Sequence, residues 1–355
     1  MITGWTEDHD ELRAVVRRFL ADRSPSEAVR AAAEAGAAGD RDVWAQMAEQ
    51  LGLQGLAVAE EHDGAGMGPV ELGVVLEELG RVLYVGPYLS TVAFAGQALT
   101  ASGDAEAQAR WLPGIAAGAL TATVALSESD VEATSDTVLS GTARFVVDGA
   151  TAGLVLLFVG DSLYAVDTTA GDPAGLTRRP QPTVDPTRAL ADLYLVDVPA
   201  ERIAGADDLR SRVTDLAAAA LAAEQVGGAS AALDMAVGYA KERVQFGRPI
   251  GSFQAIKHAC ADLLIAVESA RSAAFFAAVL LADGDPEGPV AASVAQSWCS
   301  ASYTKAAKQH IQVHGGLGYT WEHDAHLHLK RAKVSELLLG SPVEHRARIA
   351  DLVGI

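Results

Sequence analysis

The sequence is poor in cysteine, in aromatic residues and in basic residues. Its 355 residues include two cysteines, 6% aromatic residues, and 27 Lys and Arg against 46 Asp and Glu, which gives a formal net charge of −19. Two cysteines, Cys260 and Cys299, are too few for a disulfide framework, so we expect a reducing, cytoplasmic location. Because nucleic acids and anionic membranes bind clustered Lys and Arg, the lack of a basic tract argues against both as partners.

Neither a leader segment nor an uninterrupted apolar run is expected from the sequence. Residues 1–10 are polar and acidic, which is not the pattern of a signal peptide. The apolar stretches are interrupted by Gly, Asp, Glu or Arg, so no segment is expected to cross a bilayer. Alanine is abundant instead, and because alanine is the best helix former, the composition favours helices.

The spacing of apolar residues changes twice along the chain. Within 8–121 it has the period of amphipathic helices, as between Leu72 and Leu83. From 122 to about 203 short β-branched or aromatic segments predict strands. Helical spacing then returns, so we predict a mainly α protein with a small β-domain. The predicted domains are an N-terminal helical domain (1–121), a middle β-domain (122–206) and a C-terminal four-helix bundle (207–355).

Breaker residues divide the last part into four predicted helices. The loop 283–289 contains Asp, Gly and Pro, and the pair Gly315-Gly316 stops another helix. The predicted helices are 212–244, 254–282, 290–313 and 321–338.

Two local patterns have an ordinary structural explanation. Residues 64–69 are glycine-rich, but no strand precedes them as a dinucleotide-binding loop requires, so we interpret them as a loop between helices. His323 and His326 are three residues apart on a predicted helix, whereas His328 points elsewhere. No cysteine or carboxylate pair completes a ligand set, and we therefore expect no metal site.

Two other segments allow a functional interpretation. Residues 243–249 (RVQFGRP) follow the first long helix, where Arg243 either caps the helix end or binds an anion through its forked guanidinium. Residues 312–319 (QVHGGLGY) follow a later helix, where two glycines either stop the helix or let a ligand approach the backbone closely.

Together, these two segments resemble the acyl-CoA dehydrogenase family, which has an Arg-x-x-Phe-Gly turn and, some 65 residues later, Gln-x-x-Gly-Gly-x-Gly-Tyr/Phe. Residues 51–66 and 76–81 are similar to the family's N-terminal helices. The resemblance covers essentially the whole chain and is weakest over 127–190.

The resemblance implies the family's fold of N-terminal helices, β-domain and four-helix bundle. It implies FAD as cofactor, an acyl-CoA thioester as substrate and electron-transfer flavoprotein as acceptor. In the family a glutamate removes the α-proton and a hydride passes to the flavin. The residues implied to bind the FAD of a neighbouring subunit are Arg243, Phe246, Gln312, Gly315 and Gly316, with Gln254 as a further candidate.

The chain departs from the family at the catalytic base. Leu339 stands where many members carry the glutamate, and Ala217 stands at the position that other members use. Glu224 and Glu336 are the nearest substitutes, but helix geometry separates them from these positions by more than the roughly 3 Å that a base can span. We therefore predict no catalytic residue, with Glu224 and Glu336 as the alternatives and surface or packing charge as their ordinary role.

The chain also departs from the family where a subunit holds its own flavin. Residues 127–130 (SESD) lack the family's glycine loop, and Val147 replaces a threonine whose hydroxyl contacts the flavin. The chain thus resembles the short, non-catalytic subunits of heterotetrameric (α2β2) actinobacterial acyl-CoA dehydrogenases, several of which act in steroid side-chain degradation. A longer catalytic subunit is the implied partner. The alternatives are a homotetrameric dehydrogenase with a displaced base and a flavin-free scaffold protein.

Overall fold

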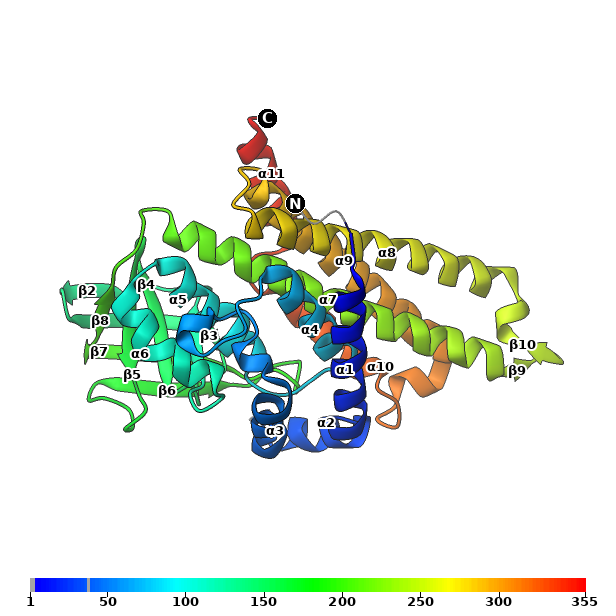
Figure 1. Ribbon diagram of the computed structural model, residues 1–355. Coiled ribbons are helices and arrows are strands. Elements are labelled where there is room, and N and C mark those ends of the chain that lie inside the picture. Colours follow the sequence, from blue (N-terminus) through cyan, green and yellow to red (C-terminus); the bar gives the residue numbers. More distant parts are fainter. Residues whose placement is uncertain (1–3, 37–38) are drawn as a thin grey trace. The chain divides into compact units, whose positions relative to one another are not determined.

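The computed structural model describes residues 4–36 and 39–355, with helices at both ends of the chain and strands between them (Figure 1). The mainly α fold with a small β-domain is confirmed. The N-terminal helices are α1 (Glu7–Arg23), α2 (Ser26–Glu34), α3 (Arg41–Leu51), α4 (Pro69–Arg81), α5 (Gln97–Ser102) and α6 (Ala105–Ala116), with a π-helical segment at Leu89–Gly96 before α5.

The chain forms two compact units that do not follow the order of the sequence. One unit comprises Met1–Val29, Gly73–Tyr84 and Ala218–Ile355, and the other comprises Arg30–Leu72 and Val85–Ala217. Helix α1 and most of α4 therefore group with the C-terminal helices, whereas α3, α5 and α6 group with the strands. The division into three domains at 121 and 206 stays a prediction.

The strands form two four-stranded sheets with orders β1-β4-β5-β8 and β2-β3-β7-β6. They share one core, in which Leu139, Val155 and Leu193 are almost fully buried. Only β1 and β4 pair in parallel among the strands of these sheets. The bounds are β1 Ala122–Ala125, β2 Glu132–Ser135, β3 Val138–Val147, β4 Leu154–Val159, β5 Ser162–Asp167, β6 Leu176–Gln181, β7 Leu190–Pro199 and β8 Glu201–Ile203.

The C-terminal helices pack around alanines and a few larger side chains. Ala232 of α7, Leu263 of α8, Tyr303 of α9 and Ala332 of α10 belong to one buried cluster. The helices are α7 (Leu209–Glu242), α8 (Gln254–Ala282), α9 (Gly288–His314), α10 (Ala325–Leu337) and α11 (Pro342–Val353).

Two features of this region correct the sequence analysis. Helix α10 begins at Ala325, so the prediction that His323 and His326 share a helix is wrong: His323 lies in the turn before it. Helix α11 was not predicted, although Ser341 and Glu344 form a reciprocal capping box at its start.

Glycine lets α4 and α7 meet at backbone distance. A Cβ added to Gly227 of α7 would lie 1.8 Å from the carbonyl oxygen of Glu77, and one added to Gly80 of α4 would lie 2.0 Å from that of Glu224. No side chain fits at either position, because the two backbones occupy the space.

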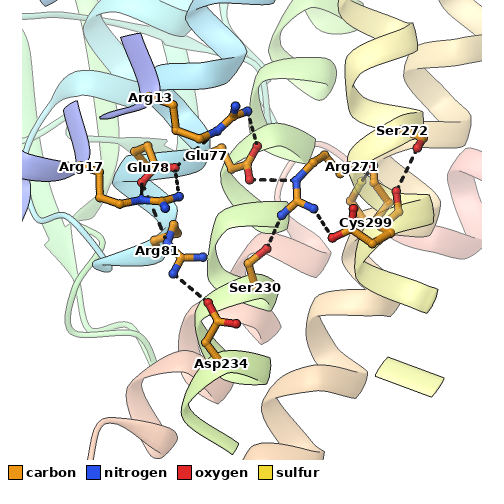
Figure 2. A network of polar contacts seen from close by, with 12 residues as sticks. Arg13, Arg17, Glu77, Glu78, Arg81, Ser230, Asp234, Arg271, Ser272 and Cys299 are labelled. Carbon is orange, nitrogen blue, oxygen red and sulfur yellow. Dashed lines mark hydrogen bonds and ion pairs between the residues drawn. The ribbon is translucent and has the colours of Figure 1, made fainter. Parts of the chain in front are cut away.

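Two consecutive buried carboxylates of α4 organise the charges around this contact (Figure 2). Glu78 is 1% exposed and accepts a bidentate pair of hydrogen bonds from Arg17 of α1, at 2.7 and 2.8 Å. This hydrogen bond is the main cause of the raised pKa of Arg17. Arg13 and Arg81 also lie within 3.7 and 3.9 Å of the Glu78 carboxylate, so the buried charge is fully compensated.

Glu77 holds α8 in the same way (Figure 2). Its carboxylate accepts a hydrogen bond from Nε of Arg271 at 3.0 Å, and Arg271 also donates to the hydroxyl of Ser230 on α7 at 2.8 Å. Arg271 thus joins α4, α7 and α8 through one guanidinium.

Two helices of the described chain, α7 and α8, are long and apolar enough to cross a membrane by length and composition. This differs from the expectation that no segment qualifies. In the structure, 94% of the most apolar window of α7 and 50% of that of α8 are buried inside the protein, as is typical of core helices in soluble proteins.

Candidate functional site

The segment after α7 forms a small exposed hairpin. Strands β9 (Val244–Gln245) and β10 (Arg248–Pro249) pair antiparallel, and the amide of Ile250 donates to the carbonyl of Arg243 at 2.8 Å. Phe246 occupies the turn with a φ of 54° and is 92% exposed. Burial of such a ring is worth about 1.5–3 kcal/mol, so the hairpin presents a side chain that gains from being covered.

The segment after α9 contains two glycines whose backbone is exposed. Helix α9 ends at His314, and Gly315 then takes a φ of 59° with a ψ of −132°, a conformation that favours glycine. A Cβ added to Gly315 or Gly316 would meet nothing within 4 Å, so the space above both glycines is open to a ligand. Gln312, in the last turn of α9, is exposed.

The structure brings both segments to the same end of the helical unit. The ring of Tyr239, one turn before Arg243, stacks on His314 with centroids 4.2 Å apart. Ala240 and Val313 belong to one small apolar cluster, against which Ile256 of α8 also packs. Gln254, the first residue of α8, is exposed near this cluster.

These residues suit the groups that FAD carries. A guanidinium such as that of Arg243 can donate two parallel hydrogen bonds to a phosphate. The open backbone at Gly315 and Gly316 admits a group at van der Waals distance, and the exposed ring of Phe246 offers an apolar surface. We therefore find that the donor set fits a diphosphate attached to aromatic rings.

The two positions at which the resemblance implies a catalytic base hold apolar side chains in the structure. Leu339 follows α10 with a φ of 64°, and its carbonyl oxygen accepts a hydrogen bond from Nε2 of His345 at 3.0 Å. Ala217 is 1% exposed. Neither side chain has an atom that accepts a proton.

The two alternative acids both have partners. Glu224 is 6% exposed and forms an ion pair of 2.9 Å with Arg331, which is itself buried and donates to the carbonyl of Tyr84 at 3.3 Å. Glu336 accepts a hydrogen bond from the hydroxyl of Thr304 at 3.2 Å and pairs with Lys333. Glu224 is thus a buried packing charge and Glu336 a partly exposed one.

The β-domain segments that the resemblance implies for binding of a subunit's own flavin form structural contacts. Val147 is 5% exposed, and its carbonyl accepts a hydrogen bond from the hydroxyl of Thr123 at 2.6 Å. Asp130 accepts one from the amide of Thr142, and the carbonyl of Glu128 accepts one from Arg144 at 2.8 Å. These contacts connect strands. The side chain of Val147 has no hydroxyl that could contact a flavin.

Comparison with known proteins covers nearly all of the chain. Residues 6–119 match the model of the acyl-CoA dehydrogenase N-terminal domain, and residues 205–353 match that of the acyl-CoA dehydrogenase C-terminal domain. The acyl-CoA dehydrogenase IpdE2 of Mycolicibacterium smegmatis is 37% identical over 344 residues, which are 97% of this chain and 98% of that protein. The acyl-CoA dehydrogenase FadE34 of Mycobacterium tuberculosis is 37% identical over 94% of this chain, which corresponds to 46% of its own length.

Solved structures agree with this result. A variant of the Tcur3481–Tcur3483 steroid ACAD superposes with a TM-score of 0.89 at 31% identity over 98% of both chains. The ChsE4–ChsE5 complex from Mycobacterium tuberculosis superposes with a TM-score of 0.91 at 27% identity over 100% of this chain and 99% of that chain. Sequence and fold agree, and the chain belongs to the acyl-CoA dehydrogenase family of flavin-dependent oxidoreductases.

Proposed function

We propose that the chain is a subunit of an acyl-CoA dehydrogenase complex, in which it completes the FAD site of a longer catalytic partner and supplies no base of its own. The proposal rests on one observation, which is the contrast between the two positions of the catalytic base and the exposed residues implied to bind FAD. Both base positions hold apolar side chains, Leu339 and Ala217, whereas Arg243, Phe246 and the Gly315 turn stand exposed at one end of the helical unit.

Each exposed residue has a role in this proposal. The guanidinium of Arg243 binds the pyrophosphate, the backbone at Gly315 and Gly316 lies against it, and Phe246 packs on the cofactor or its subunit. Gln312 and Gln254 donate hydrogen bonds from the same end of the unit. The chemistry that FAD would supply when bound is acceptance of the hydride from the β-carbon of the acyl-CoA.

The names of the related structures support a two-component assembly. One is a complex of ChsE4 with ChsE5, and another is a steroid ACAD formed by Tcur3481 and Tcur3483. By analogy we propose an α2β2 complex in the cytoplasm, with a steroid or fatty acyl-CoA as substrate and electron-transfer flavoprotein as acceptor.

The alternative acids do not favour a self-sufficient enzyme. A general base must be free to accept a proton within about 3 Å of the substrate. Glu224 would have to give up its ion pair with Arg331, and breaking a buried ion pair costs about 3–5 kcal/mol. Glu336 is held by Lys333 and Thr304.

The test is acyl-CoA oxidation by the chain alone and by the chain co-expressed with a longer acyl-CoA dehydrogenase encoded beside it. Loss of the general base lowers a rate by about 10²–10⁴-fold, so we expect no measurable turnover from the chain alone and normal turnover from the flavin-containing complex. Ordinary turnover by the chain alone would establish a homotetrameric enzyme. A complex that is colourless after FAD addition would instead establish a scaffold.

A further inference from the structure

Three histidines converge where α9 ends. His310 and His314 lie four residues apart on α9, which places them on the same helix face, and His323 approaches them from the turn before α10. One ring nitrogen of each lies within 4.8 Å of the others. The ring centroids are 4.6 Å apart for His310 and His314, 5.2 Å for His310 and His323, and 4.2 Å for His314 and His323.

The innermost ring has unused hydrogen-bonding capacity. His310 is 0% exposed, and neither of its ring nitrogens has a hydrogen-bond partner among the residues that the structure describes. A buried polar group without a partner has a free-energy cost. A ligand that accepts a lone pair from His310 would remove this cost.

The second ring is oriented as in known metal sites. Nδ1 of His314 donates to the carbonyl oxygen of His310 at 2.9 Å, which leaves the lone pair on Nε2. A metal-bound histidine almost always donates its other N–H to a carbonyl or carboxylate in this way. Burial lowers the pKa of His310 to about 2 and also lowers that of His314.

We propose that His310, His314 and His323 bind one divalent transition-metal ion of the Zn²⁺ class. Imidazole nitrogen suits Zn²⁺, Co²⁺ and Ni²⁺, whereas Mg²⁺ and Ca²⁺ require oxygen ligands, which this set lacks. Three histidines leave the fourth tetrahedral position for water. The sequence pattern had directed attention to His323, His326 and His328, of which only His323 belongs to this set.

His323 is the ligand that closes the site. In the metal-free protein the amide of Ala325 donates to its Nδ1 at 3.1 Å, which places the ring proton on Nε2. Metal binding therefore requires this ring to turn or to release the amide. His323 is only half-buried and lies outside the helices, so it has more freedom to move than His310.

The bound ion would fasten the end of α9 to the segment that leads into α10. His314 also stacks on Tyr239 of α7, so three segments would share one anchor. The glycine turn Gly315–Gly316 directly follows His314, and the ion would reduce its freedom. This inference depends on contacts within the helical unit and not on the proposed function.

The experiment uses tag-free, chelator-treated protein and Zn²⁺ titration by calorimetry, with Co²⁺ as a spectroscopic probe. We expect one equivalent to bind with a Kd of about 1 μM or tighter, and visible Co²⁺ absorption typical of nitrogen ligands. His323→Ala should weaken binding by more than the roughly 10- to 100-fold cost of losing an outer-sphere partner. His258→Ala, which removes an exposed histidine of α8, should change nothing.

His323 lies in the turn before α10 and outside the helices, so its variant should keep the wild-type circular dichroism spectrum. If folded wild-type protein takes up no Zn²⁺ at micromolar concentrations, or if His323→Ala binds as well as wild type, the site does not exist. Metal uptake is measured directly, so an inactive complex would not affect this result.

Discussion

Arg243 is the residue on which the functional proposal depends most directly. It is exposed, it follows the last turn of α7, and its carbonyl is fixed by the amide of Ile250. In a chain with a net charge of −19, a pyrophosphate would meet repulsion over most of the surface. A forked cation at the glycine turns supplies the local attraction that the molecule as a whole lacks.

We predict that Arg243→Ala lowers the FAD affinity of the reconstituted complex about 10- to 100-fold, because a charge-assisted contact to phosphate is worth about 1.5–3 kcal/mol. FAD titration into the apo complex, followed by flavin fluorescence, measures the change. Lys241→Ala is the matched control, since it removes an exposed positive charge from the same helix end. Equal affinities in wild type and Arg243→Ala would leave Arg243 as a helix-end cation worth about 0.3–1 kcal/mol of stability.

Among the elements, α4 and α7 pack too closely to admit a larger side chain at their contact. Gly227 and Gly80 each face a carbonyl oxygen of the other helix at a distance that no Cβ can occupy. The buried carboxylates of Glu77 and Glu78 lie on the same stretch of α4, so a shift of this helix would also disturb the Arg17 and Arg271 contacts.

We predict that Gly227→Ala destabilises the protein by at least about 1–3 kcal/mol, the usual cost of overpacking a core. Gly238→Ala on the same helix is the control: its added Cβ meets nothing within 4 Å, so it should stabilise by about 0.5–1 kcal/mol. Urea unfolding of both variants gives the two values. A neutral Gly227→Ala would mean that α4 and α7 can separate freely.

The helices that end at breaker residues were predictable, whereas strands without an apolar pattern were not. Helix α8 was predicted at its observed bounds, and α9 to within two residues at each end, because the loop 283–289 and the pair Gly315-Gly316 mark helix ends. Strand β2 was missed because all four of its residues are exposed, and β6 because it contains Arg178, Arg179 and Pro180. Such edge strands carry no alternation of apolar and polar residues.

At the scale of the whole molecule, the buried carboxylates of α4 are paired with arginines, but the acidic residues of the chain outnumber the basic ones. The described chain buries several carboxylates, and those of α4 are paired with arginines, but the net charge remains −19. Two like charges 20 Å apart in water repel each other by about 0.2 kcal/mol, and many such pairs add up. Compaction brings these charges closer together than they are in the unfolded chain.

We therefore predict that salt stabilises the isolated protein. Raising the ionic strength from about 10 mM to about 200 mM shortens the screening length from about 30 Å to below 10 Å. The free energy of unfolding should rise on the order of 1 kcal/mol, because screening weakens long-range repulsion more than buried pairs. Urea unfolding in NaCl and in KCl measures this, and the two salts should act alike. A fall in stability would mean that exposed ion pairs outweigh the repulsion.

The candidate site was predictable only where a motif is continuous in sequence. The Arg243 and Gly315 segments were found because each lies within eight residues, and the structure places both at one end of the helical unit. The histidine cluster was missed because its third member comes from a turn whose path no local pattern specifies. The spacing of His310 and His314 by four residues was the available signal.

The buried pair of Glu224 and Arg331 has a consequence for how this sequence can evolve. Loss of either partner breaks a buried ion pair at a cost of about 3–5 kcal/mol, whereas replacing both with apolar residues is often neutral or stabilising. The positions are 107 residues apart, so one mutation does not readily alter both. A lineage that replaces the two residues one after the other must pass through a less stable intermediate. Descendants of a common ancestor are therefore expected to keep both charges or to have lost both.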